Sequence, residues 1–308
     1  MPRPGPGQVL VRMHAAPLNP SDLGVLMGVG YGAARAYPFT PGVEGSGTVV
    51  AAGPGLMPRL FAGRRVACSG DVDGDGTWAE YMVTTAQLCV PLLPGVSLEQ
   101  GATLIVNPLT ALALLEIAGR GGHRALVSTA AASALGGMIQ RLAARRALPV
   151  INIVRKAEQV EALRAQGAAH VLNSEDPDFT AQLAALAAQL KATLWLDAIG
   201  GPLTQTLCAA APRGSTVLLY SRLSLQDSHI DARTALIKEL HFDGWFLANW
   251  LRHKNLLQTL LLARRAQSLL ATDLNTQIAA RLPLEQAQAG LDRYVGAMSA
   301  GKILLLAQ

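Results

Sequence analysis

The chain has 308 residues, of which 50% are hydrophobic and 15% are charged, and its formal net charge is +5 at pH 7. This length allows two domains with separate cores, and the composition excludes a disordered or fibrous protein. No apolar run approaches the roughly 18 residues of a membrane-spanning helix, and an aromatic content of 5% disfavours a nucleic-acid surface. Because Cys68, Cys89 and Cys208 form neither a disulfide framework nor a CxxC pair, we predict a cytoplasmic protein with no membrane or nucleic-acid partner.

The first ninety or so residues predict short β-strands. Their apolar and β-branched runs are separated by Gly- and Pro-rich turns, and they lie at residues 9–13, 48–52, 65–68 and 81–84. From residue 98 onward, helical segments rich in Ala and Leu alternate with short apolar runs at residues 125–128, 150–154, 169–172, 194–197 and 215–220. Strand and helix in alternation predict a parallel sheet with helices on both faces.

After about residue 242 the pattern is mixed again, and it ends on the apolar run 302–306. We therefore predict an α/β protein in which a Rossmann doubly wound parallel sheet is inserted into a β-rich domain. The predicted limits are 98–242 for the nucleotide domain and 1–97 with 243–308 for the other domain.

The segment after the run 125–128 is a candidate phosphate-binding turn. Such a turn brings backbone N–H groups to a pyrophosphate at the start of a helix, and its usual pattern is G-x-G-x-x-G. Here the three positions are Ala131, Ser133 and Gly136, so only the last glycine is present. A plain helix start is therefore an equally good interpretation of the turn alone.

A basic pair favours the nucleotide interpretation. About 20 residues beyond the turn, an NAD-binding site carries an acidic residue for the ribose 2′-hydroxyl, whereas this chain has Arg155 and Lys156. A carboxylate would repel a 2′-phosphate and a guanidinium binds it through two hydrogen bonds. The alternative is a solvated loop, but the spacing predicts NADPH.

One segment partly matches a calcium-binding motif. Residues 71–76 match the first half of an EF-hand loop, but the twelfth position, where the loop needs a bidentate Glu, is Met82. No histidine pair has the spacing of zinc ligands, and no G-x-S-x-G motif is present. We predict no metal, and we expect the chemistry to be hydride transfer by the cofactor.

Several stretches resemble the medium-chain dehydrogenase/reductase superfamily over essentially the whole chain. They are residues 16–22 (APLNPSD), 41–47 (PGVEGSG), 76–81 (GTWAEY) and 167–168 (GA). The zinc alcohol dehydrogenases of that family place a zinc-binding Cys near Ser21 and a zinc-binding His just before Glu44. This chain has a Ser or Asn at the first position and Val43 at the second. It thus resembles the zinc-independent branch, which combines a GroES-like catalytic domain with the Rossmann domain.

Within that branch, residues 106–111, 151–155 and 244–250 are similar to the mitochondrial-type 2-enoyl thioester reductases. The resemblance implies that Tyr31 is the proton donor, that Asn19 and Thr110 position groups near the nicotinamide, and that Trp250 lines the acyl pocket. It also implies a homodimer made by pairing the Rossmann sheets. The cofactor contacts that it implies, together with those of the turn and the basic pair, are Asn107, Ser133, Ala134, Leu135, Arg155, Lys156, Tyr220, Ser221, Trp245, Phe246, Leu247 and Lys302.

The chain departs from the family pattern at three places. Lys156 and Ala157 follow Arg155 in place of an acidic and a second basic residue, and Ser221-Arg222 stands for the usual Gly-Gly. The sequence also begins at what would be the second strand, so the N-terminal hairpin is expected to be missing. Tyr31 has a competing interpretation as a packed loop aromatic, and Trp245 and Trp250 have one as core residues.

The function that these patterns predict is NADPH-dependent reduction of an activated C=C bond in a 2-enoyl thioester or enone, a small-molecule substrate. Hydride would reach the β-carbon, and Tyr31, whose ordinary pKa of about 10 keeps it protonated, would protonate the α-carbon. The first alternative is an NADPH:quinone reductase, which needs no special proton donor. The second is a non-catalytic NADPH-binding scaffold or regulatory protein.

Overall fold

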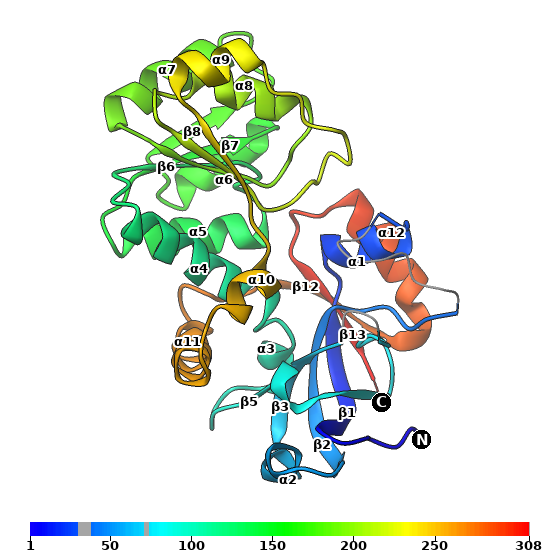
Figure 1. Cartoon of the computed structure of the whole chain (residues 1–308). Coiled ribbons are helices and arrows are strands. Elements are labelled where there is room, and N and C mark those ends of the chain that lie inside the picture. The colour runs from blue at the N-terminus through cyan, green and yellow to red at the C-terminus, as the bar shows by residue number, and fades with distance from the viewer. Residues whose placement is uncertain (30–37, 71–73, 308) are drawn as a thin grey trace. The chain divides into compact units, whose positions relative to one another are not determined.

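A computed structural model describes residues 1–29, 38–70 and 74–307, and these form two compact units (Figure 1). Unit 1 comprises Met1–Leu109 and Leu260–Gln308, and unit 2 comprises Thr110–Thr259. The boundaries fall inside two helices, α4 (Val106–Arg120) and α11 (Leu256–Leu269). The domain limits predicted from the sequence stay a proposal.

Unit 1 is built around one mixed sheet. Apart from the parts of α4 and α11 that belong to it, its elements are β1 (Gln8–Pro17), α1 (Pro20–Leu26), β2 (Glu44–Ala52), α2 (Leu56–Phe61), β3 (Arg65–Ser69), β4 (Tyr81–Thr85), η1 (Ala86–Leu88), β5 (Cys89–Pro91), α3 (Leu98–Ala102), β12 (Ile278–Pro283), η2 (Leu284–Gln286), α12 (Ala287–Gly296) and β13 (Lys302–Leu306). The strand order is β12-β13-β1-β2-β3-β5, and β4 pairs with β1.

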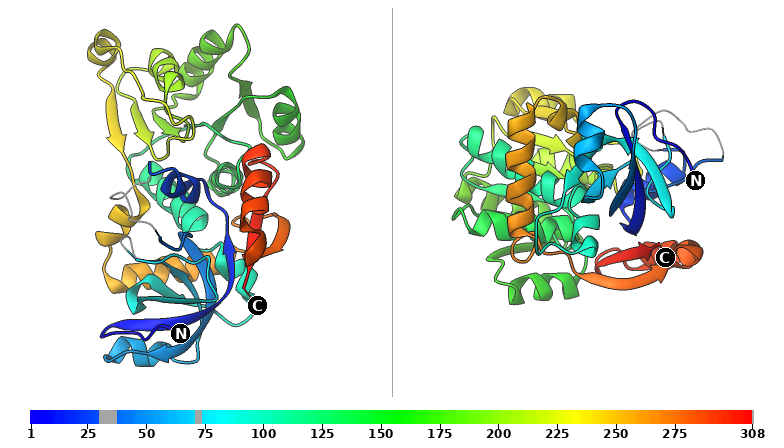
Figure 2. Two further views of the ribbon diagram at one scale, coloured as in Figure 1. Left: turned by 90° about the vertical axis from the view of Figure 1, so that its right-hand side faces the viewer. Right: turned by 90° about the horizontal axis from the view of Figure 1, so that it is seen from below.

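Strand β1 organises this sheet, because it is antiparallel to β2, β4 and β13. Its side chains alternate between the two faces, so Val11 and Met13 are buried while Arg12 and His14 are exposed. Helix α12 packs on β13, the strand that brings the last part of the chain into the same sheet as the first (Figure 2).

Unit 2 alternates strands and helices, as the sequence predicts. Its elements are β6 (Leu126–Ser128), α5 (Ala134–Ala144), β7 (Val150–Val154), α6 (Ala157–Ala165), β8 (His170–Asn173), α7 (Phe179–Leu190), β9 (Leu194–Asp197), α8 (Pro202–Ala210), β10 (Thr216–Leu219), α9 (Ala232–Lys238), β11 (His241–Gly244) and α10 (Leu247–Arg252).

The sheet of unit 2 is parallel, with the order β11-β10-β9-β6-β7-β8. Counted from β6, this is the 3-2-1-4-5-6 order of a Rossmann sheet read from the opposite edge, with the order reversing between β6 and β9. One face packs on α7 and α8 around the fully buried Trp195, and α4 and α5 lie across the other face (Figure 1). The doubly wound prediction is confirmed.

Candidate functional site

The turn between β6 and α5 has the form of a phosphate-binding turn. Ser133 is the N-cap of α5, and its Oγ accepts a hydrogen bond of 3.1 Å from the N–H of Gly136. The N–H of Ala131 donates to the carbonyl of Ile153 in β7, which ties the turn to the neighbouring strand. The positive end of the 11-residue helix therefore begins at the carboxyl edge of the sheet, where an anion is stabilised.

Gly136 is the one glycine of the pattern that packing requires. A Cβ atom at this position would lie 2.4 Å from the carbonyl oxygen of Ala131, so the helix could not approach the turn as closely. Ser133 has a φ of −75°, which any residue adopts, so its backbone conformation does not require glycine. The partial match of the sequence to G-x-G-x-x-G thus keeps the glycine that packing demands.

A buried hydrogen-bond network holds the neighbouring loop after β9. Asp197 is fully buried and accepts hydrogen bonds from Thr204 Oγ1 (2.7 Å), Ile199 N (2.9 Å) and Gly200 N (3.1 Å). Thr129, at the end of β6, donates to the same carboxylate over 3.2 Å. This network joins β6 and β9 at the switch point of the sheet, the usual place for a dinucleotide. Asp197 was missed from the sequence, where its signal was an acidic residue closing a strand.

Arg155 and Lys156 follow β7 directly, and both are exposed. Lys156 is the N-cap residue of α6, and its Nζ lies 3.8 Å from Glu158. Because β7 is parallel to β6, the basic pair and the turn lie at the same carboxyl edge of the sheet. This is the arrangement that the sequence predicts for a 2′-phosphate site.

Tyr220 follows β10 and lies at the same edge, with its N–H donating to the carbonyl of Asp197 over 3.0 Å. Burial, and then the negative charge of Asp197, raise the pKa of the Tyr220 hydroxyl, so it is a protonated hydrogen-bond donor at neutral pH. Ser221 comes next in the chain and is half-buried.

The aromatic segment after β11 forms a small cluster. The rings of Trp245 and Trp250 are 6.3 Å apart with an interplanar angle of 53°, and Lys254 Nζ lies 4.0 Å above the Trp250 ring. Lys254 also pairs with Glu116 over 2.7 Å. The Nε1 atom of Trp245 is buried and has no hydrogen-bond partner among the described residues. Phe246 is the 40% exposed N-cap residue of α10, and half-buried Leu247 begins that helix.

Unit 1 contains a buried cluster of polar side chains, comprising Asn19, Asp22, Glu44 and Lys302, each at most 3% exposed. The ammonium of Lys302 donates to Asn19 Oδ1 and, over 3.1 Å, to the carbonyl of Leu18. Asn19 Nδ2 donates to Glu44 Oε1 over 3.2 Å. The oxygen and the nitrogen of the Asn19 amide are thus both committed within the cluster, which fixes the amide orientation.

The two carboxylates of this cluster also organise the backbone. Asp22 accepts hydrogen bonds from the N–H groups of Asn19 (2.7 Å) and Val43 (2.8 Å). Glu44 Oε2 accepts from Ile105 N (3.0 Å) and Val106 N (2.9 Å), where α4 begins. The cluster therefore connects α1, β2, β13 and the start of α4.

Burial shifts the pKa of each charged group in the cluster towards its neutral form. It raises the pKa of Asp22 from 3.8 to about 7, against the lowering effect of its hydrogen bonds and of Lys302. It also raises the pKa of Glu44 and lowers that of Lys302, while the attraction between them opposes both shifts. Desolvation is thus the largest influence on all three groups, and the charges of the neighbours only partly offset it.

The sequence-predicted residues are therefore distributed between the units. Asn19 and Lys302 are brought together, and Asn107 is buried near the start of α4. Thr110, on α4, is buried, and Ser133, Ala134 and Leu135 open α5. Tyr31 lies outside the described residues. Asp22 and Glu44 were missed as functional candidates, although their signal was an acidic residue in each of the two family-like segments 16–22 and 41–47.

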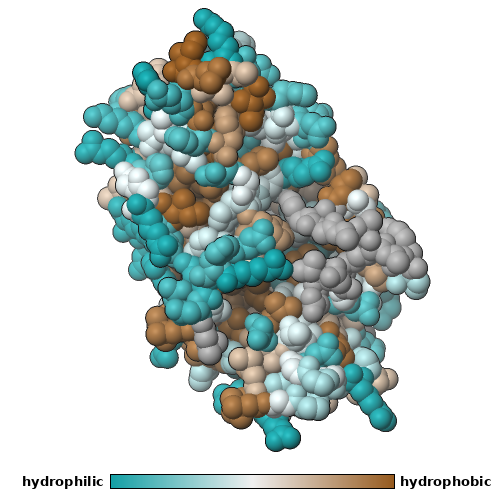
Figure 3. Space-filling model, in the orientation of Figure 1, coloured by the Kyte–Doolittle hydropathy of each residue, from teal (hydrophilic) through white to brown (hydrophobic). Residues whose placement is uncertain are grey.

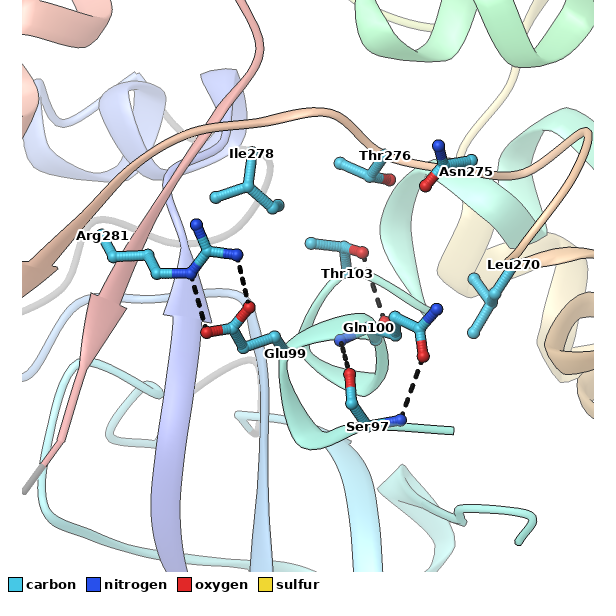
Figure 4. Close-up of a pocket in the computed structure, with 9 residues that line it drawn as sticks. All are labelled: Ser97, Glu99, Gln100, Thr103, Leu270, Asn275, Thr276, Ile278 and Arg281. Atoms are coloured by element: carbon cyan, nitrogen blue, oxygen red, sulfur yellow. Dashed lines mark hydrogen bonds and ion pairs between the residues drawn. The ribbon is translucent and has the colours of Figure 1, made fainter. Parts of the chain in front are cut away.

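A separate pocket in unit 1 contains none of the predicted site residues (Figure 4). Arg281 forms two hydrogen bonds of 2.8 Å with Glu99 at one side, and Ser97 and Gln100 form a reciprocal helix cap at another. These four groups satisfy one another, whereas the Oγ1 of Thr276, which also lines the pocket, is buried without a hydrogen-bond partner among the described residues.

The described residues contain no group of three or more His, Cys, Asp or Glu side chains placed to hold a metal ion. Residues 71–73 of the EF-hand-like segment lie outside the described ranges. Across residues 1–29, 38–70 and 74–307, no helix has the length and apolar character to cross a membrane.

Two family descriptions match the chain: the alcohol dehydrogenase GroES-like domain over residues 5–94 and the zinc-binding dehydrogenase over residues 134–261. The human mitochondrial enoyl-[acyl-carrier-protein] reductase is 28% identical over 96% of this chain and 80% of its own length. Its Arabidopsis thaliana counterpart is 29% identical over 79% of this chain and 65% of its own length, so the chain spans about two thirds of that relative.

Solved structures share the whole fold. A candidate NADPH:quinone reductase from Mesorhizobium loti is 35% identical, with a TM-score of 0.93 and coverage of 99% of this chain and 88% of that one. The quinone oxidoreductase from Thermus thermophilus, solved also with NADPH, resembles the fold with 22% identity, a TM-score of 0.77 and coverage of 99% and 93%.

The GroES-like and Rossmann units are those of a family of nicotinamide-dependent oxidoreductases. The chain belongs to the medium-chain dehydrogenase/reductase family, and the resemblance found in the sequence is confirmed.

Proposed function

We propose that the protein is an NADPH-dependent reductase of activated C=C bonds in 2-enoyl thioesters or enones. The observation that carries the cofactor choice is the exposed pair Arg155 and Lys156 at the carboxyl end of β7, beside the turn that begins α5. A guanidinium and an ammonium there favour a 2′-phosphate, whereas NAD gives them no anion to bind.

The residues present fit the dinucleotide. The close packing of Gly136 on Ala131 holds the N-terminus of α5 against the turn, and the backbone N–H groups there suit a pyrophosphate. The unpartnered Nε1 of Trp245 and the protonated hydroxyl of Tyr220 supply further hydrogen-bond donors in unit 2. We include Asn107, Ser221, Phe246, Leu247 and Lys302 among the proposed contacts on the resemblance alone.

Bound NADPH supplies the hydride. The chain's own part is to bind the acceptor, stabilise the charge that develops on its carbonyl oxygen and deliver a proton to the α-carbon. We assign the proton to Tyr31 and positioning to Asn19 and Thr110, with Trp250 in the acyl pocket. The fixed amide of Asn19 supports its positioning role, because Lys302 and Glu44 leave it one orientation.

A quinone reductase is the second candidate, and it is favoured by the likeness to the Mesorhizobium loti protein. NADPH oxidation should therefore be followed with crotonyl-CoA, 2-cyclohexenone and a naphthoquinone, in wild type and Tyr31→Phe. Enoyl reduction that falls at least tenfold in Tyr31→Phe is the expected result. Rapid quinone turnover with no effect of the substitution would favour the quinone reductase, and tight NADPH binding without turnover would favour the scaffold.

The cofactor assignment has its own test. In an Arg155→Asp, Lys156→Asp double variant, the Kd for NADPH should rise by at least tenfold while that for NADH changes little, because only NADPH carries the 2′-phosphate. Arg164→Asp is the matched control, since Arg164 is an exposed base in α6 that pairs with Glu161. An undiminished preference of the double variant for NADPH over NADH would refute the assignment.

We also propose a zinc-independent enzyme, because Val43 and Ser21 or Asn19 occupy the positions where the zinc enzymes of the family place ligands. Unchanged activity after treatment with a chelator, with no zinc detected by elemental analysis, is the expected result. The cytoplasmic location remains a prediction, which fractionation of the source cells would test.

The proposed homodimer rests on unit 2. Strand β11 ends the sheet order and has mostly exposed residues, and Leu236 and Ile237 of α9 are 78% and 60% exposed. Hydrophobic side chains gather at the end of the surface where α7, α8 and α9 lie (Figure 3). Light scattering should give twice the chain mass, and Leu236→Asp with Ile237→Asp should reduce it.

A further inference from the structure

The structure places two of the three cysteines opposite each other, although they are well separated in sequence. Cys68 of β3 and Cys89 of β5 are direct partners at one end of the antiparallel register, which continues with the pairs Ala67–Val90 and Val66–Pro91. Side chains of directly opposite residues point to the same face of a sheet. Both cysteines accordingly belong to one buried core cluster, with exposures of 0% and 6%.

The hydrogen bonds of the ladder identify the kind of pair. Leu92 N donates to Arg65 O over 2.9 Å, so residues 65 and 92 form a hydrogen-bonded pair. Pairs alternate along an antiparallel ladder, and Pro91, which has no N–H, falls on a non-hydrogen-bonded pair with Val66. Two residues further, the Cys68–Cys89 pair is again non-hydrogen-bonded. Such pairs have Cα atoms about 4.5 Å apart, within the 4.4–6.8 Å that a disulfide spans.

Neither thiol is used by the polar cluster or the dinucleotide turn. The Sγ of Cys68 lies 3.9 Å from Met13 Sδ, and that of Cys89 lies 3.9 Å from the carbonyl of Thr85. Both are weak contacts that a covalent bond could replace. Burial raises the pKa of both thiols, so they stay protonated while the sheet is closed.

Strand β5 is short, and it ends the order of the described sheet. Its outer side is held by Gln267 of α11, whose Oε1 accepts from Leu93 N over 2.7 Å and whose Nε2 donates to Pro91 O over 3.2 Å. Separation of β5 from this amide is therefore a route by which Cys89 reaches solvent.

We propose that Cys68 and Cys89 are a redox site that closes a reversible cross-strand disulfide when a small-molecule disulfide is present. The thiolate of one cysteine attacks glutathione disulfide, which forms a mixed disulfide and releases one glutathione. The second cysteine then attacks the mixed disulfide, which forms the Cys68–Cys89 bond and releases the second glutathione. Two protein thiols lose two protons and two electrons, and glutathione disulfide is reduced to two molecules of glutathione.

The test incubates the full-length reduced protein with glutathione disulfide at pH 8, quenches with acid, and maps the peptides by mass spectrometry. The expected product is a peptide pair linked through Cys68 and Cys89, abolished in Cys89→Ser, retained in Cys208→Ser and reversed by dithiothreitol. Glutathione adducts without the linked pair, or linkage that needs denaturant, would overturn the proposal.

The role of Gln267 gives a second, kinetic measurement. In Gln267→Ala, linkage should form at least threefold faster than in wild type, because β5 loses its outer hydrogen bonds. Gln166→Ala, at an exposed C-cap of α6 in unit 2, is the matched control and should leave the rate unchanged. An unchanged rate in Gln267→Ala would overturn the opening of β5 as the route to the disulfide.

Discussion

Replacing Lys302 with Met removes an ammonium group from a cluster that contains two buried carboxyl groups and keeps the apolar stem of the side chain. In the wild-type protein this ammonium binds Asn19 Oδ1 and the carbonyl of Leu18, and its charge lowers the pKa values of Asp22 and Glu44. Without it, the pKa of each carboxyl should rise further, because burial remains the largest contribution to both.

The size of the effect on stability follows from the pKa shift of Asp22. Raising the pKa of Asp22 from 3.8 to about 7 on folding corresponds to on the order of 4 kcal/mol. Because the folded pKa is the higher one, this penalty is absent below pH 3.8 and complete above about pH 7. In Lys302→Met the penalty continues to grow above pH 7, because each further unit of pKa adds about 1.4 kcal/mol.

Urea unfolding followed by circular dichroism at pH 5.5 and 8.5 measures this difference. The free energy of unfolding should fall more at pH 8.5 than at pH 5.5, where Asp22 is protonated, by about 1.4 kcal/mol for each unit by which the pKa of Asp22 rises in the variant. Lys191→Met, at the exposed C-cap of α7, is the control and should change neither value. A loss that is equal at both pH values, or no loss at pH 8.5, would refute the electrostatic reasoning.

Gly136→Ala should destabilise unit 2 and weaken NADPH binding at least tenfold by isothermal titration, because its Cβ would lie 2.4 Å from Ala131 O. Gly137→Ala, which meets only the flexible end of an arginine side chain, should bind normally, and equal binding by both variants would contradict the packing argument. Ser133→Ala should lower the stability of unit 2 by about 1 kcal/mol in urea unfolding, through loss of the N-cap; an unchanged midpoint would speak against it. Alkylation of Cys89 by iodoacetamide should still accelerate between pH 8 and 9.5, because burial raises its pKa to about 12, and a plateau near pH 8.5 would exclude this.

The alternating strands and helices of the Rossmann unit could be predicted from the sequence because short local patterns specify them. Five of its six described strands are short apolar runs, and the turn before α5 carries Gly136 at the position where close packing requires it, whereas the mostly exposed β11 was not predicted. Position in the alternating pattern, rather than the incomplete glycine motif, predicted the turn. Strand β12 was not predicted, because its residues are only partly buried and lack a clear apolar alternation.

The polar cluster and the cysteine pair could not be predicted from local sequence patterns. Lys302 meets Asn19 only because β13 pairs with β1, and nothing near either residue in the sequence specifies that pairing. Cys68 and Cys89 looked scattered, since antiparallel register depends on turns and bulges between them rather than on the cysteines themselves. Contacts between distant segments can be identified only once the pairing of the strands is known.

The pairing of β1 with β13 also bears on how the protein is made. In that register Pro17 lies opposite Leu304, so the first strand leaves the ribosome long before its neighbour exists. At translation rates of about 5–20 residues per second, this delay is roughly 15–60 s. Unit 2, which is continuous in the chain, can fold during that interval, while β1 remains without one edge of its sheet. Until β13 has been synthesised, the edge of β1 that it covers stays open for pairing with another strand.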